Sequence, residues 1–154
     1  MYSARRRKAS SSCAASDLVK PMTDLVFFYG TLMSAFRRPG RARLDGFLEL
    51  IGRGRIQAAL FDLGIYPAAV PADDSSVWGE VHRMADVDVV LAALDEIEGY
   101  RVGQPDASLY TRSEIAVTLE GDRSKTAWAY FYNAPLGKAP RIPSGDYLEY
   151  LTVR

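Results

Sequence analysis

The stretch ADVDVVLAALDEIEGY, residues 85–100, predicts the main helix of this chain. Asp86 is a suitable N-cap, because its short side chain can accept a hydrogen bond from the first helical turn. Gly99 can adopt the left-handed conformation at which many helices end. Between these two residues, apolar side chains recur at helical spacing and gather on one arc of the helical wheel. We therefore expect a helix that packs one face against a core.

Glu98 occupies an unfavourable position for a carboxylate on this helix. It lies within the apolar arc, about 20° from Leu91 on the wheel. It also lies in the last turn, where the helix dipole disfavours negative charge by about 0.3–1 kcal/mol. Burial and the dipole both raise a carboxyl pKa, which suits a general base. The alternative is a terminal side chain that turns to solvent, and periodicity alone leaves both open. Asp95 and Glu96 fall at or beyond the edge of the arc and predict a solvated face.

Most of the remaining chain predicts strands. Leu25–Tyr29 is a continuous apolar run, as in a central strand covered on both faces. Gly52 and Gly54 predict a bend or bulge before a strand near Ile56–Phe61. We also expect a turn at 62–64, followed by a short strand that ends at Pro71. A strand of alternating character is expected at 76–84. Two further strands, at 109–119 and 125–133, are expected to be joined by a turn at 120–122. The pattern predicts an α+β fold, with a small mixed, curled or barrel-like β-sheet and one main packed helix.

The first apolar run ends abruptly in the sequence Tyr29-Gly30-Thr31-Leu32. Gly30 would allow the backbone to approach a ligand closely, because it has no side chain. Thr31 adds a hydroxyl that can donate or accept a hydrogen bond. An ordinary strand-ending turn explains the same residues. For Tyr29, and for Tyr110 at the start of a later strand, core packing is as good an interpretation as ligand contact. The tyrosines of the 125–133 strand, with Trp128, are interpreted as core.

Composition excludes several classes of function. The chain has 154 residues, one cysteine and one histidine, so neither an intramolecular disulfide nor a zinc site of the usual ligands can be built. The formal net charge is zero, which argues against nucleic acid as a partner. No apolar run approaches the length of a bilayer span, so no membrane partner is expected. The single cysteine fits a reducing compartment, and we expect a cytoplasmic location.

Residues 1–22 differ in composition from the rest. They hold five Arg or Lys side chains and one Asp, which leaves 14 basic and 18 acidic residues in the remainder. The segment has no usable apolar periodicity and no apolar core of a secretory signal. We predict a disordered basic extension over residues 1–22 and one domain over residues 23–154. An alternative expectation is that the protein starts at Met22, which immediately precedes the first core strand.

Together these segments resemble the gamma-glutamylcyclotransferase-like family. The matching pieces span residues 25 to about 133 in the family's order: VFFYGTL, GIYPA, VWGEVHRM, LDEIEGY, YTR and AWAYFYN. YGTL alone is a short pattern, whereas YGTL followed some sixty residues later by LDEIEG is far more specific. The resemblance implies a small mixed barrel with a cavity at its mouth.

The resemblance also implies a site. Tyr29, Gly30, Thr31 and Leu32 would cradle a gamma-glutamyl group, Glu98 would be the acid/base, and Tyr110 would line the cavity. In the implied reaction, the substrate's α-amino group attacks its own side-chain carbonyl, which forms 5-oxoproline and releases an amine or amino acid. The substrate would be a small gamma-glutamyl compound, with no metal and no cofactor. Two alternatives remain: a non-catalytic small-ligand-binding module of the same fold, and an interaction protein that works through residues 1–22. The oligomeric state stays open.

Overall fold

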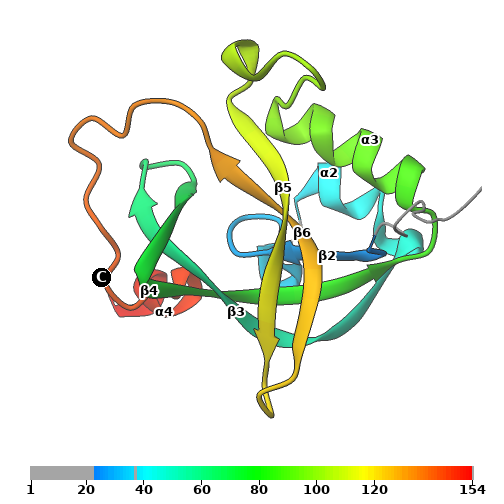
Figure 1. The fold of residues 1–154 in the computed structure, drawn as a ribbon, viewed down its shortest axis with the longest axis horizontal. Helices are drawn as coiled ribbons and strands as arrows, with labels where there is room; N and C mark the ends of the chain where they lie inside the picture. The colour runs from blue at the N-terminus through cyan, green and yellow to red at the C-terminus, as the bar shows by residue number, and fades with distance from the viewer. Residues whose placement is uncertain (1–22, 37, 154) are drawn as a thin grey trace, which may run out of the picture.

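The computed structural model describes residues 23–36 and 38–153, so the predicted extension over residues 1–22 lies outside the described residues. Five strands close into a barrel in the order β2-β4-β3-β5-β6 (Figure 1). The strands are β2 (Leu25–Phe28), β3 (Leu48–Asp62), β4 (Pro67–Met84), β5 (Tyr110–Leu119) and β6 (Ser124–Tyr132). The helices are α2 (Pro39–Ala42), α3 (Val87–Glu98) and α4 (Tyr147–Val153). The prediction of a mixed, barrel-like α+β fold is confirmed.

Strand β2 closes the barrel and makes the sheet mixed. It pairs antiparallel with β4, and it pairs parallel with β6 where Val26 lies opposite Trp128. All four of its side chains are buried. The expectation of a strand covered on both faces is therefore confirmed. Because neither face of β2 meets solvent, apolar and polar residues do not alternate along it.

The long hairpin of β3 and β4 corrects one prediction. The expected short strand closed by Pro71 is wrong, because β4 continues through this residue to Met84. Pro71 pairs with Ala58, and the next pair along the ladder is Gln57 with Ser76, so the register shifts at this point. Proline has no N–H to give to a ladder, and a bulge tolerates that loss. A second shift between Leu50 and Gly52 confirms the bulge that the glycines predicted.

Helix α3 has the predicted caps. The Asp86 side chain accepts a hydrogen bond from the Val89 N–H at 3.2 Å, and Gly99 has a left-handed φ of 68°. Val90, Leu91 and Leu94 are buried against the barrel. Figure 1 shows α3 across one end of the barrel with α2 beside it, whereas α4 lies on the far side. The two caps and the packing of one face of α3 against the barrel thus fix the position of its last residue, Glu98, at the barrel mouth.

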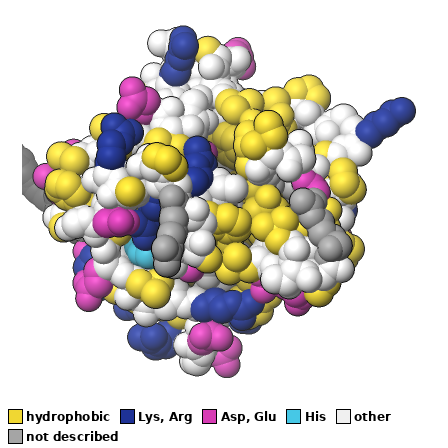
Figure 2. Space-filling model, turned by 180° about the vertical axis from the view of Figure 1, so that it is seen from behind, with side chains coloured by type: hydrophobic (Ala, Val, Ile, Leu, Met, Phe, Trp, Pro, Cys, Tyr) yellow, Lys and Arg dark blue, Asp and Glu magenta, His cyan; other side chains and the backbone are white. Residues whose placement is uncertain are grey.

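Near the C-terminus, the sequence predicted only a short end segment, and the structure has helix α4 there. Tyr147 of α4 is buried, and its ring lies 5.8 Å from that of Phe36. The Trp78 N–H donates to the Gly145 carbonyl at 2.8 Å, which ties the approach to α4 onto β4. Among the described residues, no helix has the length and apolar character needed to cross a bilayer. The face of the molecule seen in Figure 2 gathers hydrophobic side chains beside a recess near its centre.

Candidate active site

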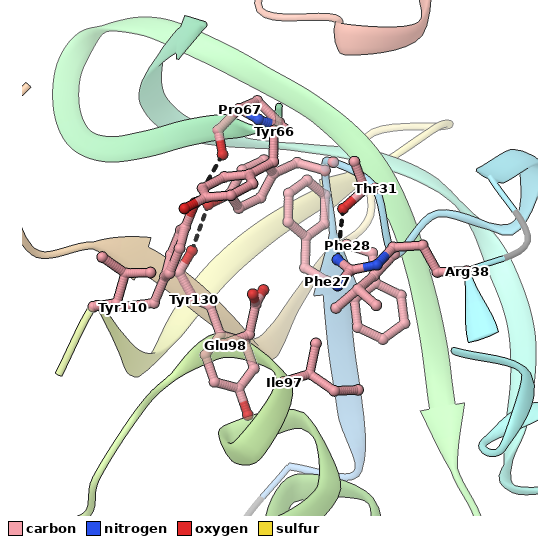
Figure 3. A pocket seen from close by; sticks show the side chains of 14 residues that line it. Phe27, Phe28, Thr31, Arg38, Tyr66, Pro67, Ile97, Glu98, Tyr110 and Tyr130 are labelled. Carbon is pink, nitrogen blue, oxygen red and sulfur yellow. Dashed lines mark hydrogen bonds between the residues drawn. The ribbon is translucent and has the colours of Figure 1, made fainter. Parts of the chain in front are cut away.

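A cavity of about 150 Å³ lies at the barrel mouth (Figure 3). It lies where the loop after β2, the end of α3, the β3–β4 hairpin and strands β5 and β6 meet. All six residues predicted for the site line it, although their roles remain predictions. The lining residues are Phe27, Phe28, Tyr29, Gly30, Thr31, Leu32, Arg38, Tyr66, Pro67, Ile97, Glu98, Leu109, Tyr110 and Tyr130.

Glu98 is the carboxyl group of this cavity. Its side chain extends from the end of α3 toward the space between Tyr66 and Arg38 in Figure 3. Burial raises the pKa of Glu98 to about 7, against a smaller lowering by the positive charge of Arg38. No described residue donates a hydrogen bond to its carboxylate, so among the described residues the charge of Arg38 offsets only part of the loss of water. A carboxyl with these properties can both accept and return a proton near neutral pH.

The loop after β2 lines the cavity with Gly30, Thr31 and Leu32. The Met33 N–H donates to the Gly30 carbonyl at 3.0 Å and closes the turn. Within the described part of the chain, the N–H groups of Thr31 and Leu32 donate to no backbone carbonyl. A Cβ on Gly30 would lie 2.8 Å from Pro67 Cγ, closer than carbon atoms pack. Glycine is therefore needed here because β4 begins directly against the turn.

Two arginines from the α2 region hold this loop. Arg41 is buried, and its Nε donates to the Leu32 carbonyl at 3.2 Å. Arg38, which precedes α2, donates from Nη1 to Thr31 Oγ1 at 2.8 Å. Each bond fixes a different residue of the turn, one through the backbone and one through the side chain. These two bonds hold the turn in one conformation, so it is preorganised before any ligand binds.

The predicted tyrosines form walls of the cavity and have hydrogen-bond partners. Tyr29 donates to the Tyr130 carbonyl at 2.7 Å and accepts from the Ala69 N–H at 3.3 Å. Tyr110 donates to the Pro67 carbonyl at 3.0 Å. Burial raises the pKa of both phenols far above their usual value, and the nearby Glu98 charge adds to the rise. Both therefore stay neutral, which suits them to shape the cavity and not to remove a proton.

The prediction that Asp95 belongs to a solvated face is wrong. Its side chain is 14% exposed and accepts a 2.6 Å hydrogen bond from the Tyr130 hydroxyl. Arg112 Nε lies 3.0 Å from the same carboxylate, and its guanidinium lies 4.8 Å from the Trp128 ring. Strands β5 and β6 cover the polar edge of α3, which a helical wheel of α3 alone does not show. Tyr130, interpreted as core, is correspondingly both a packing residue and part of the cavity wall.

Sequence reasoning missed Arg38 and Tyr66 as lining residues. Tyr66 follows the predicted turn at 62–64, and its ring lies 6.2 Å from that of Tyr110. Arg38 lies in a stretch with several arginines, and no spacing rule separates it from its neighbours. The GIYPA segment, which carries part of the family resemblance, contains Tyr66 and could have indicated it. Only the folded structure identifies Arg38 as a lining residue.

The histidine does not take part in this cavity. His82 is buried in β4, and its Nε2 lies 3.0 Å from Glu80 Oε1, outside the lining residues. Across residues 23–36 and 38–153, no three His, Cys, Asp or Glu side chains are grouped so that they could hold a metal ion. The titratable carboxyl that lines the cavity is Glu98.

Comparison with known proteins places the chain in a family. Residues 26–149 match the family model described as gamma-glutamyl cyclotransferase, AIG2-like. The chain is 32% identical over 126 residues to the gamma-glutamylcyclotransferase family protein YtfP of Escherichia coli K12, and the match covers 80% of this chain and 96% of that protein. The solution structure of Escherichia coli ytfP superposes with a TM-score of 0.59 at 30% identity, over 82% of this chain and 97% of that one. The crystal structure of YkqA from Bacillus subtilis gives a TM-score of 0.63 at 26% identity, over 86% of this chain and 42% of that longer one. This chain therefore belongs to the AIG2-like gamma-glutamyl cyclotransferase family.

Proposed function

We propose that the protein cyclises a gamma-glutamyl group to 5-oxoproline and releases an amine or amino acid, with Glu98 as general acid/base. One observation carries the proposal: a carboxyl whose pKa is raised to about 7 lines the same cavity as the tight turn at residues 30–32. Family membership supports the reaction class. The geometry supports the assignment of roles within it.

The proposed reaction involves two proton transfers, one as the α-amino nitrogen bonds to the side-chain carbonyl carbon and one as the leaving nitrogen departs from that carbon. Ionised Glu98 accepts a proton from the substrate's α-amino group as that nitrogen bonds to the side-chain carbonyl carbon. A tetrahedral intermediate forms, with negative charge on the former carbonyl oxygen. Glu98 then gives the proton to the leaving nitrogen as the old C–N bond breaks, so the carboxylate is regenerated. A group with a pKa near the working pH performs both transfers efficiently.

The turn at residues 30–32 would stabilise the developing oxyanion. The N–H groups of Thr31 and Leu32 are without backbone acceptors among the described residues, and they belong to a turn that Arg41 and Pro67 hold in place. Donors fixed in advance stabilise transition-state charge without the cost of reorientation. The neutral tyrosine walls exclude water and hold the flexible glutamyl chain in a folded conformation, which favours attack on its own carbonyl.

The non-catalytic binding module is the rival function. It would keep the same cavity and bind a small amino-acid-like ligand without turnover. The two functions separate in one assay, in which purified protein is incubated with a gamma-glutamyl dipeptide, glutathione and a gamma-glutamylamine. We expect release of 5-oxoproline from at least one of these compounds. If none is turned over while 5-oxoproline binds in calorimetry, the binding module is the correct function.

A further inference from the structure

Arg38 is a cation of the cavity wall that forms no ion pair within the described part of the chain. Among the described residues, its guanidinium donates one hydrogen bond, to Thr31 Oγ1 at 2.8 Å. The side chain is half-buried, and Figure 3 shows its charged end beside Thr31 at the edge of the cavity. A half-buried cation with one neutral partner keeps most of its hydrogen-bonding capacity for a ligand.

The chemistry of a guanidinium restricts what that ligand can be. Arginine has five N–H donors in a planar fork, which matches the two oxygens of a carboxylate. The Thr31 bond fixes the orientation of the fork and leaves the other donors available. Arg38 and Glu98 line one cavity but are not close enough for an ion pair with each other. The cavity therefore offers separate places for a negative and a positive ligand group.

We propose that Arg38 binds the α-carboxylate of the substrate and is the residue that restricts the site to ligands with a free carboxylate beside the reacting amine. An α-amino acid carries its ammonium and carboxylate on the same carbon, so its two charges complement Glu98 and Arg38. The inference rests on the proposed function for the identity of the ligand. It adds that gamma-glutamyl compounds whose α-carboxyl group is an amide or ester are poor substrates.

Occupation of Arg38 also changes the environment of Glu98. The charged or titratable groups that act on Glu98 are Arg38, Tyr29, Tyr110 and Tyr130, and burial keeps the three phenols neutral. Arg38 lowers the pKa of Glu98. A carboxylate bound to Arg38 offsets this positive charge, so it removes part of the lowering that Arg38 exerts on the pKa of Glu98.

The test compares Arg38→Gln with wild type and with Arg43→Gln, which removes an exposed arginine close in sequence. Each protein is assayed on one gamma-glutamyl substrate and on the same compound with an α-carboxamide. Loss of a charge-assisted hydrogen-bonded contact changes binding by about 10- to 100-fold. We expect Arg38→Gln to raise KM for the free acid by that factor, to lose the preference for acid over amide, and to shift the kcat/KM pH profile to a higher pKa. Arg38→Lys keeps the charge without the fork and should restore part of the preference, whereas Arg43→Gln should match wild type.

A binding measurement separates this inference from the proposed function. Calorimetry with 5-oxoproline and with its carboxamide needs no turnover, and it is run on wild type and Arg38→Gln. Acid-selective binding that Arg38→Gln abolishes supports the carboxylate site even if no substrate is turned over. Turnover by wild type with an unchanged KM and acid preference in a folded Arg38→Gln protein would overturn the inference and leave the proposed function intact. Absence of both turnover and binding would overturn both.

Discussion

The carboxyl group of Glu98 and the backbone turn at Gly30 line one cavity, although they come from the end of α3 and from the loop after β2. The caps and buried face of α3 place the first, and contact with Pro67 places the second. In the proposed reaction, Glu98 would be the proton acceptor and the N–H groups of the turn would be the fixed donors that stabilise the oxyanion. Such a pair is what a cyclisation at a carbonyl carbon requires.

The pH dependence of activity should report Glu98. The proposed reaction needs the ionised carboxylate in the free enzyme, and burial raises its pKa to about 7. We therefore expect kcat/KM to rise about tenfold per pH unit below 7 and to level off above it. Initial rates measured between pH 5 and 9 at constant ionic strength check this. A profile that is flat from pH 5 to 7 would show that no group with this pKa limits the reaction.

Glu98 should also make the protein less stable as pH rises. Its folded-state pKa of about 7 lies above the ordinary value of 4.5, so between these values the folded protein holds a proton that the unfolded chain has released. Unfolding then releases a proton, and the free energy of unfolding falls as pH rises from 4.5 to 7. Glu98→Gln should be more stable than wild type at pH 8, by at most about 3 kcal/mol. At pH 4 the two proteins should unfold at nearly the same urea concentration, and a gain there as large as at pH 8 would contradict this account.

Gly30→Ala should damage the turn. The new Cβ would lie 2.8 Å from Pro67 Cγ, so either the loop or the start of β4 must shift. We expect a loss of about 1–3 kcal/mol in the free energy of unfolding and a fall of about 10- to 100-fold in kcat/KM. Gly46→Ala is a matched control, because a Cβ at that position meets no atom within 4 Å. Equal activity of the two variants would mean that the close approach at Gly30 has no role in the site.

The contact between Asp95 and Arg112 should hold the last turn of α3 in place. Asp95→Ala leaves Arg112 and the Tyr130 hydroxyl without their shared acceptor. Removing one partner of a largely buried pair costs about 3 kcal/mol, and we expect this loss in urea denaturation, with a reduced kcat because Glu98 lies three residues further along α3. Glu96→Ala, at an exposed neighbouring position, should stay within about 0.5 kcal/mol of wild type. A similar loss of free energy of unfolding in Asp95→Ala and Glu96→Ala would show that the contact of Asp95 with Arg112 does not hold the last turn of α3 in place.

The features that were predicted correctly from the sequence depend on residues that are close together in the chain. The caps of α3, the apolar run of β2 and the placement of Glu98 on the buried arc depend on neighbours within a few residues, and all are present in the structure. The continuation of β4 through Pro71 could not be predicted in this way, because it depends on a bulge opposite Ala58 of another strand. The environment of Asp95 depends likewise on Arg112 and Tyr130, which only the closed barrel brings to α3.

The most direct test of the central claim is the rate of 5-oxoproline release by Glu98→Gln on a substrate that wild type turns over. Glutamine keeps the size of the side chain and cannot accept the proton. We predict a loss of kcat of at least about 100-fold in a protein that remains folded by circular dichroism, while Glu96→Gln, on the exposed side of the same helical turn, keeps wild-type activity. Wild-type activity in Glu98→Gln would contradict the assignment of Glu98 as the general acid/base.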